Sequence, residues 1–193
     1  MKICLFGGTF DPPHLGHLLI AQSICESEGF DKVLFIPAYE PPHKVNISNV
    51  MHRVSMLNLA IKDNPKFELS NIEIERQGIS YAIDTIIGIK KSINIKSNEC
   101  YYLMGSDSLI DLNNWKEPLR ILDECKVIVA ARPGFQLSKI EPWILKKIQF
   151  AKIPKFELSS TNIRKRWLKN LTIRYMVTLP VWEYINEKGL YIN

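Results

Sequence analysis

Residues 2–17 read KICLFGGTFDPPHLGH, and the order of features in this stretch decides the fold. The apolar, partly β-branched run Lys2–Phe6 predicts a buried strand, and Leu15–Ser27 has the composition of a helix that packs on a sheet. Gly7 and Gly8 lie between the two. Because a helix N-terminus presents free N–H groups and a positive dipole end, a glycine turn at this place favours phosphate binding.

The same alternation of strand and helix patterns continues along the chain. We expect strands at Lys2–Phe6, Lys32–Pro37, Phe67–Ile74, Glu99–Met104, Lys126–Ala130 and Lys147–Ile153. We expect helices at Leu15–Ser27, Val50–Lys62, Ile83–Ser92, Asp107–Leu112, Thr161–Lys169 and Val177–Glu187. Such alternation predicts an α/β fold with a largely parallel sheet, in which ligands bind beyond the carboxyl ends of the strands.

Length and composition limit the class of protein. A chain of 193 residues that is 46% hydrophobic suits one globular domain, which we expect to span residues 1–193. No apolar run approaches the roughly 18 residues that cross a bilayer, and the N-terminus has no signal-peptide pattern, so we expect a soluble cytoplasmic protein. Cys4, Cys25, Cys100 and Cys125 are scattered, which favours reduced, packed thiols over disulfides or a metal site.

The charge is moderately positive. The formal net charge is +5, and Lys and Arg are concentrated after Lys139, above all in Arg164-Lys165-Arg166. This balance attracts anions and fits nucleotides or nucleic acid. Charge alone does not decide between these two classes of ligand.

Two histidines occupy the start of the first predicted helix. Neither Gly-x-Gly-x-x-Gly nor a Gly-x-x-x-x-Gly spacing followed by Lys-Ser/Thr occurs in this chain. In their place His14 and His17, three residues apart, share one face of the first helical turn. Imidazoles in this position donate hydrogen bonds to phosphate oxygens and stabilise charge without becoming covalent intermediates.

Other interpretations of this histidine pair stay open. The two side chains also suit a structural pair that caps the helix, or two zinc ligands at helical spacing, although no nearby Cys or Glu-containing metal motif supports zinc. Their protonation is open as well, because the helix dipole disfavours an imidazolium whereas a bound triphosphate favours it.

A second anion site is predicted near the C-terminus, where Ser159, Ser160 and Thr161 precede a basic helix. Hydroxyl and N–H groups at the helix start, with Arg164 one turn later, form a cradle for an anion. Taken alone, these residues are equally compatible with an N-cap at Ser160 or Thr161 and a solvated basic face.

The two segments together carry a resemblance. Residues 7–17 resemble the N-terminal signature of the nucleotidyltransferase superfamily that is marked by His-x-Gly-His, and residues 159–164 are similar to its second signature, Ser-Ser-Thr-x-Ile-Arg. The resemblance implies a Rossmann-like, doubly wound sheet with helices on both faces. It implies that His14, His17 and Arg164 are catalytic and hold ATP from opposite sides. The implied ATP site comprises Gly7, Gly8, Thr9, Phe10, His14, His17, Gly105, Asp107, Ser160, Thr161 and Arg164.

Further segments resemble bacterial nicotinate-nucleotide adenylyltransferase in particular. They are Pro41-Pro42-His43-Lys44, Ser80–Thr85, Gly105–Trp115, Arg132-Pro133-Gly134 and the ending Tyr184–Tyr191. The implied acceptor is nicotinic acid mononucleotide. The implied acceptor site comprises His43, Lys44, Tyr81, Ala82, Thr85, Trp115 and Arg132.

Several side chains suit this acceptor chemically. Lys44 can neutralise a phosphate, Trp115 offers an aromatic face to a pyridinium ring, and Asp107 can accept hydrogen bonds from ribose hydroxyls. Simpler alternatives are that Trp115 packs under a loop and that Lys44 is a solvated charge. Ala82 departs from the family, which has threonine there, so a hydroxyl that helps to recognise the pyridine end is missing.

The expected reaction is in-line attack of the acceptor phosphate on the α-phosphorus of ATP, without a covalent enzyme intermediate. No motif supplies a set of carboxylates for a metal, so we expect Mg²⁺ to arrive with ATP. We expect neither a nucleic-acid nor a membrane partner, and we leave a homo-oligomer open. The alternatives are transfer to nicotinamide mononucleotide or phosphopantetheine, a basic nucleic-acid-binding module, and a non-catalytic nucleotide sensor on the same fold.

Overall fold

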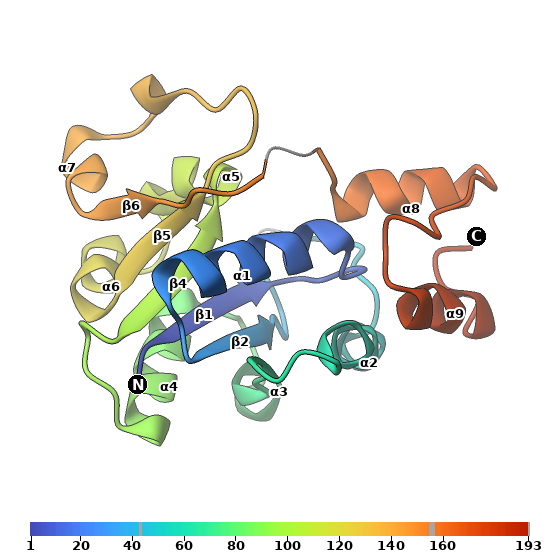
Figure 1. The fold of residues 1–193 in the computed structure, drawn as a ribbon, viewed down its shortest axis with the longest axis horizontal. Coiled ribbons are helices and arrows are strands. Elements are labelled where there is room, and N and C mark those ends of the chain that lie inside the picture. The colour runs from blue at the N-terminus through green and yellow to red at the C-terminus, as the bar shows by residue number, and fades with distance from the viewer. Residues whose placement is uncertain (43, 155–156, 193) are drawn as a thin grey trace.

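A six-stranded parallel sheet, in the order β3-β2-β1-β4-β5-β6, forms the centre of the molecule. The computed structural model describes residues 1–42, 44–154 and 157–192, apart from the side chain of residue 139. The strands are β1 Ile3–Gly8, β2 Lys32–Pro37, β3 Phe67–Leu69, β4 Cys100–Gly105, β5 Lys126–Ala130 and β6 Ile148–Phe150. The chain adds β2 and β3 on one side of β1 and then adds β4, β5 and β6 on the other side. This is the predicted doubly wound arrangement (Figure 1).

Helices join successive strands and cover both faces of the sheet. They are α1 Leu15–Glu28, α2 Val50–Ile61, α3 Ile72–Arg76, α4 Ala82–Ile93, α5 Ser106–Ile110, α6 Pro118–Glu124, α7 Pro142–Leu145, α8 Ser160–Leu168 and α9 Leu179–Glu187. Two short 3-10 helices, Leu112–Asn114 and Leu137–Lys139, complete the elements of the described chain.

The alternation of side chains along β1 separates two core layers. Ile3 and Leu5 pack in the cluster that contains α4 and α6, whereas Cys4 and Phe6 pack in the cluster that contains α1. Figure 1 shows α1 crossing the front of the sheet. Because both faces are covered, the central strands read as continuous apolar runs. All four cysteines are buried and free, as predicted.

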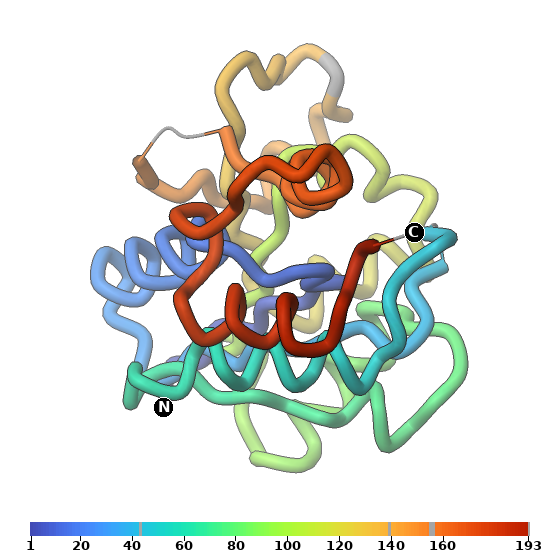
Figure 2. The backbone as a smooth tube through the Cα atoms, turned by 90° about the vertical axis from the view of Figure 1, so that its right-hand side faces the viewer, coloured from blue at the N-terminus to red at the C-terminus, as the bar shows by residue number. Residues whose placement is uncertain are grey.

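The C-terminal helices form a third cluster on α2. Met56 of α2 packs with Ile163 of α8 and with Val181 and Ile185 of α9. Figure 2 shows the C-terminal helix alongside α2. This packing returns the end of the chain to the N-terminal half of the sheet. None of the helices in the described ranges is both long and apolar enough to cross a membrane.

The predicted strand Phe67–Ile74 is wrong in its second half. β3 ends at Leu69, and Ile72–Arg76 form α3. Ile72 and Ile74 follow the two-residue period of a strand, which misled the prediction. Glu73 in the first turn and Arg76 in the last turn oppose the helix dipole favourably.

Besides α3, two more short helices were not predicted. Both α6 and α7 begin with a proline, at Pro118 and Pro142, which suits the first turn of a helix because its N–H has no partner there. With only seven and four residues, they are too short to show a helical period.

Candidate active site

One cavity of about 1040 Å³ lies beyond the carboxyl ends of β1, β2, β4 and β5. Of the site residues predicted from the sequence, His43 lies outside the described residues and Thr85 does not line the cavity. The others all line it: Gly7, Gly8, Thr9, Phe10, His14, His17, Lys44, Tyr81, Ala82, Gly105, Asp107, Trp115, Arg132, Ser160, Thr161 and Arg164.

The histidine pair lies at the start of α1. The two imidazole rings stack with centroids 3.7 Å apart and an interplanar angle of 20°. The backbone N–H of His14 donates to Nδ1 of His17 at 3.2 Å, so the His17 side chain helps to cap the helix. Because Nδ1 accepts this bond, neutral His17 carries its proton on Nε2. The ring therefore has both a structural contact and a free N–H donor.

Gly8 and Phe10 shape the floor beneath these histidines. A Cβ atom on Gly8 would lie only 2.9 Å from the Phe10 ring, so only glycine permits this close approach. The Phe10 ring is buried and packs edge-on against His17 with centroids 5.0 Å apart. It supports His17 from below and offers little open surface to a nucleotide.

Both imidazoles are neutral at pH 7. Burial, reinforced by the positive charge of Arg132, lowers the pKa of His14 to about 4. Burial and the neighbouring His14 lower the pKa of His17 well below its ordinary value. His17 therefore acts as a neutral hydrogen-bond donor unless an anion in the cavity favours protonation.

We expect His14 to make the free energy of unfolding fall as the pH falls from 6.5 towards 4. The folded pKa of about 4 lies below the ordinary 6.5, so the unfolded chain binds the proton more tightly in this window. The loss is about 2 kcal/mol at about pH 5 relative to about pH 8. Urea unfolding of wild type and His14→Gln at several pH values in this range measures the free energy of unfolding. If this free energy has the same pH dependence in both proteins, the lowered pKa of His14 is contradicted.

The second predicted segment docks directly on the first loop. Ser159 is the N-cap of α8, since its Oγ accepts from the Asn162 N–H at 3.2 Å. The cap therefore lies before both positions, Ser160 and Thr161, that the alternative interpretation of the sequence offered. Ser160 Oγ donates instead to the carbonyl of Pro12 at 2.9 Å, and Arg164 Nη1 donates to the carbonyl of Asp11. The two segments that the sequence predicts to bind phosphate therefore meet.

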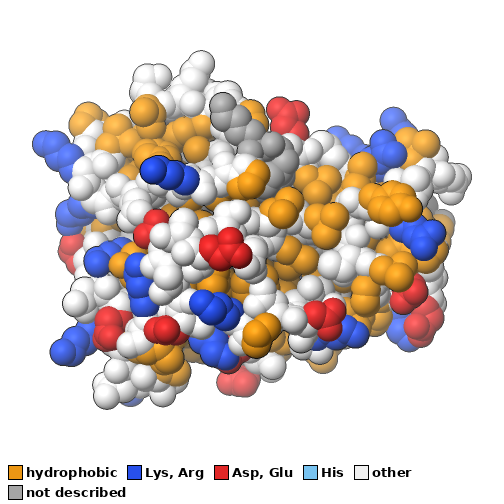
Figure 3. Space-filling view, viewed as in Figure 1, with side chains coloured by type: hydrophobic (Ala, Val, Ile, Leu, Met, Phe, Trp, Pro, Cys, Tyr) orange, Lys and Arg blue, Asp and Glu red, His pale blue; other side chains and the backbone are white. Residues whose placement is uncertain are grey.

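The basic run on α8 is not a uniform solvated face. Arg164 is partly buried against the first loop, Arg166 donates to the carbonyl of Thr172, and Lys165 is exposed. Figure 3 shows Lys and Arg side chains scattered among acidic and apolar ones over the face seen there. Only Lys165 fits the simpler interpretation of this run as a solvated charge.

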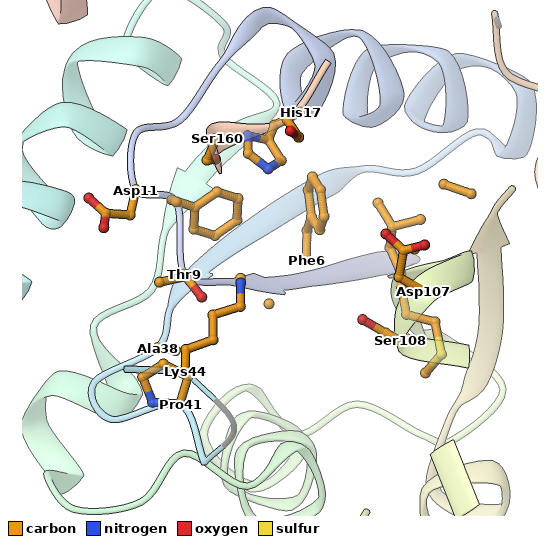
Figure 4. A pocket seen from close by; sticks show the side chains of 18 of the residues that line it. Phe6, Thr9, Asp11, His17, Ala38, Pro41, Lys44, Asp107, Ser108 and Ser160 are labelled. Carbon is orange, nitrogen blue, oxygen red and sulfur yellow. The ribbon is translucent and has the colours of Figure 1, made fainter. Parts of the chain in front are cut away.

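The loop after β2 brings Lys44 to the cavity. Figure 4 shows its side chain extending towards Thr9 of the first loop, with Asp107 and Ser108 of α5 on another wall. Asp107 forms an ion pair with Arg132 at 3.1 Å. The positive charge of Arg132 also lowers the pKa of His14, so this predicted acceptor residue acts electrostatically on the histidine pair.

Aromatic side chains also line the cavity. Trp115 is half-buried and lies edge-on to Tyr102, with ring centroids 6.3 Å apart. Tyr81 precedes α4, and the Lys116 Nζ lies 4.9 Å from its ring centroid. Trp115 therefore both packs under its loop and faces the cavity. The sequence interpretation did not include Lys116.

Thr85 requires a correction. Its side chain is buried, and its hydroxyl donates to a carboxylate oxygen of Glu73. A threonine hydroxyl can donate only one hydrogen bond, and here Glu73 accepts it. Thr85 thus orients α3 against α4 and does not contact the cavity, although the motif placed it among acceptor ligands.

Arg53 is a positioning residue that sequence reasoning missed. It is fully buried and donates to the carbonyls of Thr9 at 2.9 Å, Ala38 at 2.7 Å, Tyr39 at 3.2 Å and Ser48 at 3.0 Å. These bonds tie the loop after β1 to the loop after β2. An arginine within an amphipathic helix ordinarily suggests a solvated face, so no sequence signal indicated this role.

Comparisons with known proteins agree with this geometry. Residues 5–166 match the family model described as cytidylyltransferase-like. The nicotinate-nucleotide adenylyltransferase of Bacillus subtilis is 39% identical over 192 residues, which cover 98% of each chain. Structures of Plasmodium falciparum nicotinic acid mononucleotide adenylyltransferase, complexed with NaAD or APC, share the fold. The NaAD complex has a TM-score of 0.81 at 23% identity, and the match covers 98% of this chain and 97% of that one. The APC complex has a TM-score of 0.79 at 22% identity, and the match covers 98% of this chain and 96% of that one.

Family membership follows from the extent of these matches. The family model spans most of the chain, and the Bacillus subtilis relative aligns over nearly its full length. The chain therefore belongs to the cytidylyltransferase-like family and, within it, to the nicotinate-nucleotide adenylyltransferases.

Proposed function

We propose that this enzyme transfers the adenylyl group of ATP to nicotinic acid mononucleotide, a step of NAD biosynthesis that yields nicotinic acid adenine dinucleotide and pyrophosphate. The strongest support is the contact between the two phosphate-binding segments. Ser160 and Arg164 reach the carbonyls of Pro12 and Asp11 across 148 and 153 positions of sequence. The imidazoles of His14 and His17, the hydroxyl of Thr161 and the guanidinium of Arg164 line the same cavity, which supports a common site for the triphosphate.

The proposed reaction is a direct displacement at the α-phosphorus. An oxygen of the acceptor 5′-phosphate bonds to this phosphorus while the bond to the oxygen that leads to the β-phosphate breaks. The electron pair leaves with pyrophosphate, so no enzyme group becomes covalently attached. The N–H donor of His17 and the Arg164 guanidinium stabilise the growing charge, with His14 beside them.

The remaining lining residues hold the substrates in position. We assign Lys44 to the acceptor phosphate and Asp107 to ribose hydroxyls of ATP, by charge and hydrogen-bonding capacity. Trp115 and Tyr81 offer aromatic faces to the pyridinium ring. Gly7 and Gly8 let phosphate oxygens approach the backbone.

A divalent cation fits this chemistry as part of the nucleotide. Within the described ranges, no three His, Cys, Asp or Glu side chains gather as a metal site. Mg²⁺ keeps several waters and binds readily to substrate phosphates, so we propose that it arrives with ATP. When bound, it neutralises charge on the triphosphate oxygens.

A direct assay tests the proposed function. Purified protein is mixed with ATP, Mg²⁺ and, in separate reactions, nicotinic acid mononucleotide, nicotinamide mononucleotide or phosphopantetheine. We expect pyrophosphate release and a dinucleotide product, identified by mass, with the highest kcat/KM for nicotinic acid mononucleotide. Release that is absent with all three acceptors contradicts adenylyl transfer, and a higher kcat/KM for another acceptor changes the substrate.

Ala82 gives a test of the preference for the acid over the amide. It is the first residue of α4 and lines the cavity, where the resembling family carries threonine. We expect Ala82→Thr to raise the kcat/KM ratio of nicotinic acid mononucleotide to nicotinamide mononucleotide about fivefold, because a hydroxyl donates more strongly to a carboxylate than to an amide. Ala82→Val has the same shape without the hydroxyl; an equal rise in that variant contradicts the explanation.

A further inference from the structure

Asp11 lies where several distant segments of the chain meet. The residue is only 2% exposed, yet each of its carboxylate oxygens has its own hydrogen-bond donor. The Tyr191 hydroxyl donates to Oδ1 at 2.7 Å, and the Ser48 N–H donates to Oδ2 at 3.0 Å. Arg164 Nη1 donates to the Asp11 carbonyl and lies 4.0 Å from Oδ2. A buried carboxylate requires such donors, and these bonds are stronger than neutral ones.

These contacts connect both halves of the cavity. Ser48 lies near the end of the loop that carries Lys44. Its N–H donates to Asp11, and its carbonyl accepts a hydrogen bond from Arg53. Arg164 belongs to α8, on the opposite side of the first loop. Asp11 therefore fixes the acceptor-side loop and the ATP-side arginine relative to the same short segment.

Tyr191 contributes to this arrangement from outside the cavity. It follows α9 and does not line the cavity, whereas Asp11 does. Burial and the negative charge of Asp11 raise the pKa of the Tyr191 hydroxyl far above its ordinary value, so it stays protonated and remains a donor. Any effect of this hydroxyl on substrates must pass through the residues that it contacts.

We infer that Asp11 is a positioning residue for both substrates, and that Tyr191, near the C-terminal end of the chain, holds it in place. The carboxylate, fixed by Tyr191 and Ser48, keeps Arg164 and the Lys44 loop in one arrangement. The inference rests on the proposed function, which assigns Arg164 to ATP and Lys44 to the acceptor.

Tyr191→Phe tests the inference, because it removes one hydroxyl and keeps the ring. We expect the KM values for ATP and for the acceptor both to rise roughly three- to thirtyfold, with a smaller change in kcat. Tyr184→Phe is a matched control. It removes a hydroxyl whose partner is His52 Nδ1 at 3.0 Å, in the same C-terminal packing but away from Asp11. We expect this control to lower Tm and to leave both KM values unchanged.

Asp11→Ala supplies the second arm of the experiment, because alanine leaves the Tyr191 hydroxyl no side-chain partner at position 11. If Tyr191 acts through Asp11, adding Tyr191→Phe to Asp11→Ala changes the KM values little, so the two effects are not additive. Additive effects overturn the inference. So do KM values that stay constant in Tyr191→Phe or rise equally in Tyr184→Phe. If thermal unfolding shows that Asp11→Ala does not fold, the comparison of Tyr191→Phe with Tyr184→Phe decides alone.

A binding measurement separates this inference from the proposed function. The dissociation constant of a non-hydrolysable ATP analogue is measured by calorimetry for wild type, Tyr191→Phe and Tyr184→Phe. We expect weaker binding only in Tyr191→Phe. If the wild type transferred no adenylyl group but this pattern held, the proposed function would fail and the positioning role of Asp11 towards ATP would stand. Equal binding in all three overturns that role.

Discussion

Replacement of His17 by alanine is expected to lower kcat/KM for adenylyl transfer by about a hundredfold or more, the usual consequence of removing one donor to a developing charge. His17 carries its proton on Nε2 because its Nδ1 accepts from the His14 N–H at 3.2 Å. Alanine removes both ring nitrogens, so the helix cap at Nδ1 and the N–H donor at Nε2 are lost together. Steady-state pyrophosphate release measures kcat/KM, and circular dichroism shows whether the fold is kept.

Two isosteric variants separate the donor from the cap. Asparagine at position 17 keeps an acceptor near the place of Nδ1 but does not reach as far as Nε2, so we expect His17→Asn to be as impaired as His17→Ala. Glutamine reaches further, and we expect His17→Gln to retain part of the activity. His52→Ala is the control histidine, because His52 contacts Tyr184 and does not line the cavity. Full turnover in His17→Asn removes the imidazole donor from the mechanism.

The residues that sequence reasoning placed correctly are those whose signal is local. Gly8, His14 and His17 lie between a buried strand and a helix, and a parallel sheet carries such a junction to the edge where ligands bind. The strand pattern of β2 and β5 gave their bounds directly, because both faces of these strands are buried. The strand prediction failed at Ile72 and Ile74, because two isoleucines spaced two residues apart fit a strand as well as one short helical turn.

What spacing did not predict depends on long-range contacts. Thr85 belongs to a recognisable motif, but only the fold turns its hydroxyl to Glu73 and away from the cavity. Arg53 looks like an ordinary surface arginine until the loops after β1 and β2 close around it. Tyr191 reaches Asp11 across 180 positions. No pattern within one sequence encodes such a pair, since each partner alone is chemically unremarkable.

Arg164→Ala is expected to lower kcat/KM by about a hundredfold to a thousandfold, chiefly because we propose that the guanidinium forms charge-assisted bonds to the transferring phosphate group. The substitution also leaves the carbonyl of Asp11 without this donor and the Asp11 carboxylate without a cation at 4.0 Å. We therefore expect a lower Tm as well. Measuring kcat/KM well below the new Tm separates the loss of catalysis from the loss of folded enzyme.

The neighbouring lysine distinguishes a specific contact from general attraction. Lys165→Ala removes the same formal charge from the same helix, but Lys165 is exposed and does not line the cavity. If net charge alone recruited ATP, both variants would lose activity equally and added salt would diminish the difference from wild type. If Arg164 binds the triphosphate directly, the kcat/KM of Lys165→Ala stays near the wild-type value. Arg164→Lys then recovers only part of the loss, because an ammonium group keeps the charge but not the planar pair of donors.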